Sequence, residues 1–228
     1  MKVLCHTLII LFLTAVSLGA TDGLSSGYDF KIRYRMINAG HANLRYVVND
    51  DTVHSEMNMN SSTWLSNLWT LADSISNRFL LSSKRLLFHE KSVNQGKYHR
   101  HYTAIFDYED SVLVNGERLA ISAPPMDLPL LIHHLRSAAF QQGDTLHFTV
   151  WDSDDLGLLS LKVEEHLHRS PLHPLQPEEL LMLTPLQSTS KSRKHGLTMR
   201  LFLAADPPHD PVKIEIRTRY GDVEMIRE

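Results

Sequence analysis

Histidine is the residue type in this sequence that can take part in the most kinds of chemistry. The chain has 14 histidines, and His99 and His101 stand two residues apart in a stretch with strand character. Residues two apart on a strand share a face, so these two imidazoles can bind one metal ion together. No carboxylate stands at a spacing that would complete the site, and alternating His, Arg, His and Tyr is equally typical of a solvated strand face. We predict no metal site and no cofactor.

Aspartates in the segment 152–157 suggest a second kind of metal site. They stand at alternating positions ahead of Gly157, a pattern found in calcium-binding loops. The match ends there, because Leu156 and Val163 occupy positions where a calcium loop needs further oxygen ligands. Aspartate and glycine between two apolar strands are ordinary turn residues, so we interpret this segment as a turn.

Catalytic motifs are absent from the sequence. It contains no glycine-flanked serine elbow, no glycine loop that could hold a phosphate and no metalloprotease helix. Glu164 and Glu165 are adjacent, and neighbouring residues on a strand point to opposite faces, so they are poorly placed to share a substrate. We predict no catalytic residues. Histidines and aspartates that converge only in the fold would still allow a hydrolase.

An apolar cluster offers a binding surface in place of an active site. The segment from Trp64 to Trp69 is rich in tryptophan and leucine and follows a polar serine and asparagine stretch. It can serve as a lid over a ligand groove, or its tryptophans can simply be core. Alternating aromatic residues on the first strands would line the groove. The predicted ligand-binding residues are Trp64, Leu65, Leu68, Trp69, Tyr34 and Tyr46.

The elements that must position these residues are mostly strands. Apolar and polar residues alternate from Tyr28 to Met36 and again from Ala42 to Val48, which predicts a hairpin. Asn115-Gly116 predicts a tight hairpin turn between 111–114 and 117–121. Further alternating stretches cover 53–59, 86–93, 98–108, 146–151, 159–166, 197–203 and 212–218. The expected fold is all-β and mainly antiparallel: a curved sheet, half-barrel, barrel or sandwich.

Two segments break this alternation. The apolar spacing between Ser62 and Leu71 suits a short helix or an apolar loop, and that between Asp127 and Arg136 predicts a helix. Asp127 is the expected N-cap, and Pro129 restricts the regular helix to the residues around and after it. The prolines from Ser170 to Pro177 indicate a connection or flexible loop, and 188–195 an exposed basic loop.

Residues 1–20 have the pattern of a secretory signal peptide: Lys2, an apolar run and small residues at the end. We expect their removal to leave residues 21–228 as a single soluble periplasmic domain without a membrane span. The only cysteine, Cys5, would be lost, so the mature chain would have no disulfide and no lipid anchor. Loss of Lys2 changes the formal charge from −3 to −4, which disfavours nucleic-acid binding.

Several short motifs resemble one family, domain of unknown function 3108. They are Ile37-Asn38-Ala39-Gly40 ahead of an alternating strand, the 130–136 helix leading to Gly143, the 206–211 turn feeding 212–216, and a terminal strand pair through Gly221. The resemblance spans about Tyr28 to Met225. It implies an exported envelope protein of a Gram-negative bacterium with a strongly β-rich fold and no established activity. It supplies no catalytic residues.

The predicted function is a non-enzymatic binding or carrier module. Its partner would be an apolar or amphipathic envelope molecule, such as a lipid or glycolipid, or an envelope protein. Curved antiparallel sheets of this kind resemble the bacterial lipoprotein carriers, which hold acyl chains in a concave apolar face. The alternatives are a hydrolase of envelope polymers and a structural or assembly factor without a small ligand. The sequence leaves the oligomeric state open.

Overall fold

The computed structural model describes residues 24–35, 37–67, 70–107, 111–121, 123–152, 155–167, 179–188, 198–218 and 221–228. The predicted signal peptide, Leu68, Trp69, the connection at 170–177 and most of the basic loop at 188–195 lie outside these ranges. The described strands are β1 (Leu24–Tyr34), β2 (Ile37–Asn49), β3 (Thr52–Ser61), β4 (Ala72–Leu80), β5 (Leu86–Gln95), β6 (Tyr98–Asp107), β7 (Ser111–Val114), β8 (Glu117–Ala120), β9 (Thr145–Asp152), β10 (Asp155–Leu167), β11 (Glu179–Ser188), β12 (Thr198–Ala204), β13 (Pro211–Thr218) and β14 (Gly221–Arg227). The described helices are α1 (Thr63–Ser66) and α2 (Leu128–Ser137).

All the described strands belong to one antiparallel sheet of 14 strands, which confirms the predicted fold class. The order is β8-β7-β6-β5-β4-β3-β2-β1-β14-β13-β12-β11-β10-β9. The first and last strands therefore meet in the middle of the sheet, with Phe30 opposite Arg227. The two outer strands, β8 and β9, come from the middle of the sequence and flank α2 along the chain.

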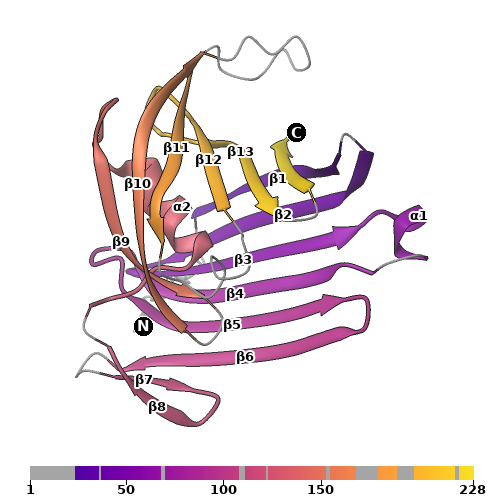
Figure 1. Ribbon diagram of the computed structural model, residues 1–228. Coiled ribbons are helices and arrows are strands. Elements are labelled where there is room, and N and C mark those ends of the chain that lie inside the picture. Colours follow the sequence, from indigo (N-terminus) through magenta and orange to yellow (C-terminus); the bar gives the residue numbers. More distant parts are fainter. Residues whose placement is uncertain are drawn as a thin grey trace, which may run out of the picture.

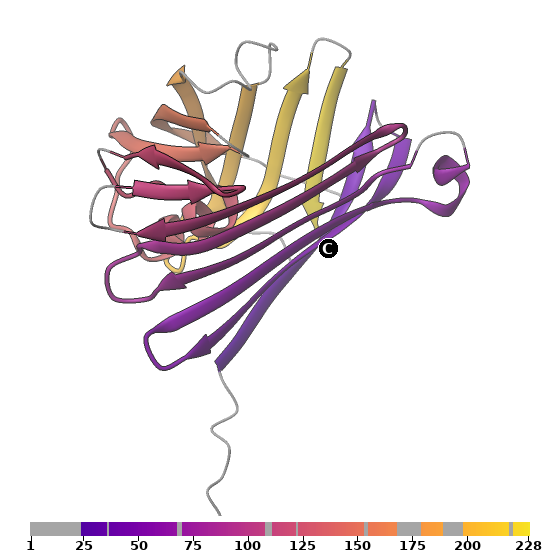
Figure 2. The same ribbon diagram turned by 90° about the horizontal axis from the view of Figure 1, so that it is seen from below.

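The sheet curls so that its two halves face each other without closing into a barrel. In Figure 1 the long strands β2–β6 form one wall, and β9–β12 run across it with α2 between them. Figure 2 shows the long strands side by side as a trough. At the seam, Lys91 on β5 pairs with Asp152 on β9 at 3.2 Å, and the rings of Phe106 and Trp151 meet edge to face at 5.4 Å. Met126 forms a parallel bridge to β9.

The inner face of the curled sheet is the core. The predicted alternation places Phe30 and Leu44 inward, Phe79 on β4 also points inward, and each of the three is fully buried. The second half contributes Leu161 and Leu183, which are buried to the same extent. Each such side chain stabilises the fold by about 1.5–3 kcal/mol, so the whole stripe from both halves holds the curl together.

The helix α2 lies inside this core. Asp127 is its N-cap and Pro129 stands in its first turn, as predicted. Leu130, Leu131 and Ile132 are all buried, although consecutive residues of a helix point about 100° apart around its axis. A helix that is apolar on several sides belongs in an interior, and α2 fills the middle of the trough. None of the described helices has the length and hydrophobicity of a membrane span.

The hairpin between β7 and β8 confirms the Asn-Gly turn. Asn115 has φ 48° and Gly116 has φ 92°, the pair of left-handed conformations that a two-residue hairpin turn requires. The segment that was expected to be a short helix or apolar loop contains α1, a single turn of four residues.

Two strands were not predicted from the sequence, β4 and β11. In β4 the inward positions include Asp73 and Asn77, so polarity does not mark its buried face. In β11 a continuous apolar run leads to Pro185, a residue that cannot donate a ladder hydrogen bond. The register between β10 and β11 shifts at Leu186, next to Pro185, and this irregularity accommodates the proline.

Candidate functional site

A row of polar residues crosses the apolar inner face of the sheet. Ser55 on β3 lies opposite Asn77 on β4, and Asn77 lies opposite His89 on β5. Tyr46 on β2 extends the row as the cross-strand partner of Ser55. All four residues are at most 2% exposed. Because they come from four strands, only the register of the sheet brings them together. We call these four residues the polar row.

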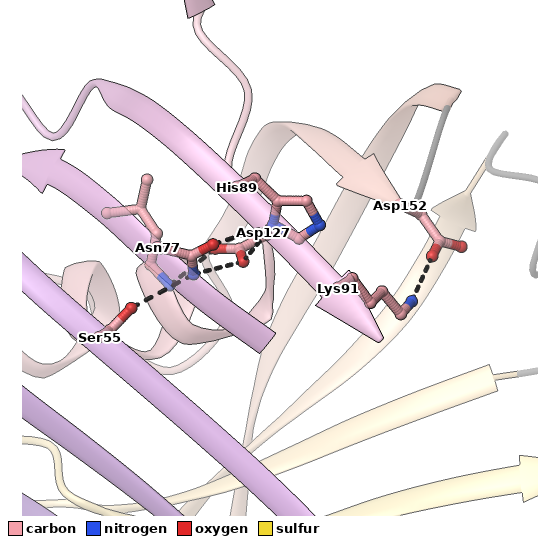
Figure 3. A network of polar contacts seen from close by, with 7 residues as sticks. Ser55, Asn77, His89, Lys91, Asp127 and Asp152 are labelled. Carbon is pink, nitrogen blue, oxygen red and sulfur yellow. Dashed lines mark hydrogen bonds and ion pairs between the residues drawn. The ribbon is translucent and has the colours of Figure 1, made fainter. Parts of the chain in front are cut away.

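Asp127, the N-cap of α2, binds to the polar row (Figure 3). Its Oδ1 accepts the capping hydrogen bond from the backbone N–H of Leu130 at 3.1 Å. Its Oδ2 accepts a hydrogen bond from Nδ2 of Asn77 at 2.6 Å and lies 3.2 Å from Nδ1 of His89. One carboxylate therefore caps the helix and also joins it to β4 and β5. Hydrogen bonds to a charged group contribute about 1.5–3 kcal/mol each.

The imidazole of His89 is oriented by two acceptors. Its Nδ1 lies 2.9 Å from Oδ1 of Asn77 as well as near the carboxylate of Asp127, so Nδ1 carries the proton. Nε2 is buried and has no hydrogen-bond partner among the described residues; in Figure 3 it points away from Asp127. A hydrolase would place a nucleophile at Nε2. Ser55 instead accepts a hydrogen bond from Asn77 at 3.2 Å.

Tyr46 attaches the first turn of α2 to β2. Its hydroxyl donates to the backbone carbonyl of Pro129 at 2.8 Å. Burial and the nearby charge of Asp127 raise the pKa of Tyr46 well above its usual value, so the phenol stays protonated and remains a donor. Tyr46 was predicted to line a ligand groove. It is 1% exposed and contacts the helix that fills the interior.

The other end of α2 is attached by charges. Arg136, in the last turn, donates from Nε to Oδ1 of Asp210 at 3.0 Å, and the hydroxyl of Tyr28 donates to the same oxygen at 2.7 Å. Arg227 on β14 reaches Oδ2 of Asp210 at 3.3 Å. The two guanidinium groups lie 5.3 and 5.1 Å from the ring centre of Tyr28. We call these four residues the Asp210 cluster.

Two titratable groups of the Asp210 cluster are shifted in opposite directions. Burial alone would raise the pKa of Asp210, but hydrogen bonds from Tyr28 and Arg136 and the charges of Arg136 and Arg227 outweigh it, so this pKa lies below its usual value. Burial and the hydrogen bond to Asp210 raise the pKa of Tyr28 far above its usual range. The cluster therefore keeps one carboxylate ionised between two cations.

The other predicted ligand-binding residues lie apart from the polar row. Figure 1 places α1 at the far end of β3 and β4, away from α2. Trp64 on α1 is 51% exposed and donates from Nε1 to the carbonyl of Asn38 at 3.2 Å. Leu65 and Tyr34 are partly buried against the core. With Leu68 and Trp69 outside the described ranges, these assignments stay predictions.

The surface histidines have local partners. Nδ1 of His99 lies 3.0 Å from the side-chain oxygen of Asn94, and His101 lies 3.1 Å from Ser92. Within the described ranges, no group of three or more His, Cys, Asp or Glu residues is arranged to hold a metal ion. At the predicted turn, Asp152 and Asp155 form the pair that ends the β9–β10 hairpin, and Asp152 binds Lys91.

Sequence reasoning identified part of this site. Asp127 was predicted as an N-cap, and His89 stands in a predicted strand. Asn77 was missed together with β4. The only sequence signal for Asn77 is that it is a polar residue within a segment long enough to be a strand. The sequence does not distinguish a buried asparagine from a solvent-exposed one.

Comparisons with known proteins place the fold and the family. The crystal structure of a beta-barrel-like protein of domain of unknown function DUF1849 from Brucella abortus is similar over 90% of this chain and 94% of that chain, with a TM-score of 0.58 and 8% sequence identity. At that identity the likeness concerns the fold alone. No curated protein matches this chain. A family model matches residues 29–227, and the chain therefore belongs to the DUF3108 family of proteins of unknown function.

Proposed function

We propose that this protein is an exported, non-enzymatic binding module of the Gram-negative envelope. Its occupant is an acyl chain, or another apolar part of an envelope lipid or glycolipid, held against the inner face of the curled sheet. The observation that carries the proposal is the nature of the filling: between the two halves of the sheet lies α2, a helix of ten residues. The likeness to a beta-barrel-like structure agrees with a sheet shaped to enclose something.

The exchange of α2 for an acyl chain is energetically feasible. Leu131, Ile132 and Leu135 give the sheet the same kind of aliphatic surface that a lipid tail would give. Hydrophobic burial is non-directional and follows the apolar area removed from water, so the apolar part of this exchange has little net cost. The polar attachments of α2 at Asp127, Tyr46 and Arg136 then decide which occupant the sheet holds.

Periplasmic location belongs to the same proposal. It rests on residues 1–20, where a basic residue, an apolar run and small residues follow one another. A binding protein for envelope lipids needs this compartment, because its ligand is found there.

The experiment is native mass spectrometry of the protein purified gently from the periplasm, followed by organic extraction. We expect a reproducible lipid or glycolipid adduct. Leu131→Ala, which shortens a buried side chain of α2, is expected to raise the bound fraction. The control Leu158→Ala alters a side chain that is 59% exposed and should change nothing. A clean apo mass for the protein and for Leu131→Ala would contradict the proposal.

A second candidate is a structural or assembly factor with no small ligand. The observation that favours it is the same filled interior, in which α2 is attached at both ends. Capture of one defined envelope protein by a chain with a clean apo mass would support this function instead. The hydrolase alternative gains nothing from the pair His89 and Asp127, because both are at most 4% exposed and no substrate reaches them.

A further inference from the structure

The middle of α2 carries two neighbouring histidines in apolar surroundings. The ring of His133 lies edge-on to Tyr46 at 5.2 Å and to Phe79 at 5.1 Å, and that of His134 lies edge-on to Phe148 at 5.9 Å. Nδ1 of each histidine is buried and has no hydrogen-bond partner among the described residues. Both residues are half-buried, and a proton added at the buried Nδ1 would have no acceptor, so these positions favour the neutral ring.

The charges that face these histidines are also unfavourable to protonation. Lys84, in the turn between β4 and β5, acts on both rings, and Arg136 acts on His133 from the same helix. From β2 the facing titratable group is the protonated Tyr46, and β4 and β9 contribute the neutral rings of Phe79 and Phe148. No carboxylate in the described ranges forms an ion pair with either histidine. Burial and then these cations lower the pKa of His133 to about 4, and burial and Lys84 lower that of His134.

The two ends of α2 respond differently to acid. At the C-terminal end, Arg136 is bound by Asp210, whose lowered pKa keeps this carboxylate ionised well into the acid range. That attachment therefore persists after the histidines have gained protons. Arg136 stands two residues after His134 in the helix, so it can serve as the hinge about which the preceding turns move.

We propose that α2 is an acid-released plug: proton uptake by His133 and His134 expels the first turns of the helix from the sheet, while Arg136 and Asp210 hold its end. Release uncovers the apolar inner face. This proposal rests on the proposed function only for the identity of the ligand that binds after release, because the movement itself needs no ligand.

Linkage gives the direction and the size of the effect. The docked ring of His133 titrates near pH 4, and a released ring titrates near its ordinary value of about 6.5. Docking is therefore fully favourable above about pH 6.5 and loses stability as the pH falls towards 4. Between pH 7 and pH 5, one such histidine raises the released population by up to about twentyfold, less whatever water screens at a half-buried ring, and His134 adds to this.

The test is hydrogen exchange of the ligand-free protein at pH 7 and pH 5, after correction for intrinsic exchange rates. We expect peptides from α2 to lose protection about fivefold to twentyfold, while peptides from β1 to β3 keep theirs. His133→Phe keeps the aromatic contacts without a titratable group, and it should remove most of the response. The matched control His99→Phe changes an exposed histidine and should leave the response intact.

Each result decides between release and its alternatives. Equal loss of protection in α2 and in β1–β3 at pH 5, or an unchanged response in His133→Phe, would overturn the proposal. If His133→Phe fails to fold at pH 7, as judged by urea unfolding, His134→Phe takes its place. Release at pH 5 in a protein that never shows a lipid adduct would support the acid-released plug and refute the proposed function alone.

Discussion

The two ends of α2 are held in the same fold by two different kinds of chemistry. The N-terminal end meets the polar row through hydrogen bonds among groups that are at most 4% exposed. The C-terminal end meets the Asp210 cluster, whose carboxylate is 25% exposed and whose partners are two guanidinium groups. Buried hydrogen bonds are strict in geometry and insensitive to salt, whereas partly exposed ion pairs are more adaptable and are partly screened. The comparison indicates that the polar row fixes the position of α2 and that the cluster tethers it.

The largest effect is expected from Asp127→Ala. It removes a cap, worth about 1 kcal/mol, and leaves one buried N–H of Asn77 unpaired at about 1–3 kcal/mol, while Nδ1 of His89 keeps Oδ1 of Asn77 as its acceptor. We expect a loss of about 2–4 kcal/mol in the free energy of unfolding, measured in urea. The control Asp144→Ala removes an exposed carboxylate that accepts one backbone N–H at 2.7 Å, and it should cost less than about 1 kcal/mol. Equal losses would mean that the polar row does not position α2.

Next in size is Asn77→Leu, which tests the row from the side of the sheet. Leucine has the same number and branching of heavy atoms but leaves the carboxylate of Asp127 without its contact at 2.6 Å, so we expect a loss of about 2–3 kcal/mol. Asn58→Leu is the matched control, because Asn58 is a half-buried asparagine on the outer side of β3. A stable Asn77→Leu protein would show that packing alone holds the helix.

A smaller effect is expected from Asp210→Asn, about 1–2 kcal/mol at pH 7. The folded-state pKa of Asp210 is lowered, so its contribution is complete above the ordinary pKa and disappears as the pH falls below it. The difference between the protein and Asp210→Asn should therefore shrink between pH 4 and pH 2. Asp222→Asn, which removes an exposed partner of Arg217, is the control. A difference that stays constant with pH would contradict the ionic account of this end.

The smallest effect separates the two ends by salt. In 1 M NaCl the screening length is about 3 Å, so the cost of Asp210→Asn should fall by a few tenths of a kcal/mol. The cost of Asp127→Ala should not change, because its partners are buried. Urea unfolding of both variants at two salt concentrations makes the measurement, and equal salt dependence would remove the distinction between the ends.

Sequence patterns predicted the parts of this molecule that depend on local rules. Alternation located most strands, Asn115-Gly116 located a turn, and Asp127 with Pro129 located the start of α2. Each of these signals acts within a few residues, through side-chain direction, φ preference or capping.

The polar row could not be predicted because it depends on register. Ser55, Asn77 and His89 come together only when β3, β4 and β5 align, and no local pattern states that alignment. Because the inward residue Asn77 is polar, β4 lacks the alternation of apolar and polar residues by which a strand is predicted. The composition of the segment at Trp64 predicted a ligand-binding site. The residue spacing of α2 predicted only an ordinary amphipathic helix and gave no sign that it fills the interior.

The meeting of β1 and β14 in the middle of the sheet has a consequence for folding. Among themselves, strands β1 to β8 pair only as neighbours in sequence, so this meander can form as soon as that part of the chain is available. The second edge of β1 pairs with β14, which lies at the far end of the chain. Until β14 is in place, this edge of β1 is unpaired. Such a late, long-range closure is slow and prone to aggregation, so we expect refolding to be slow and its yield to rise when a holding chaperone is present.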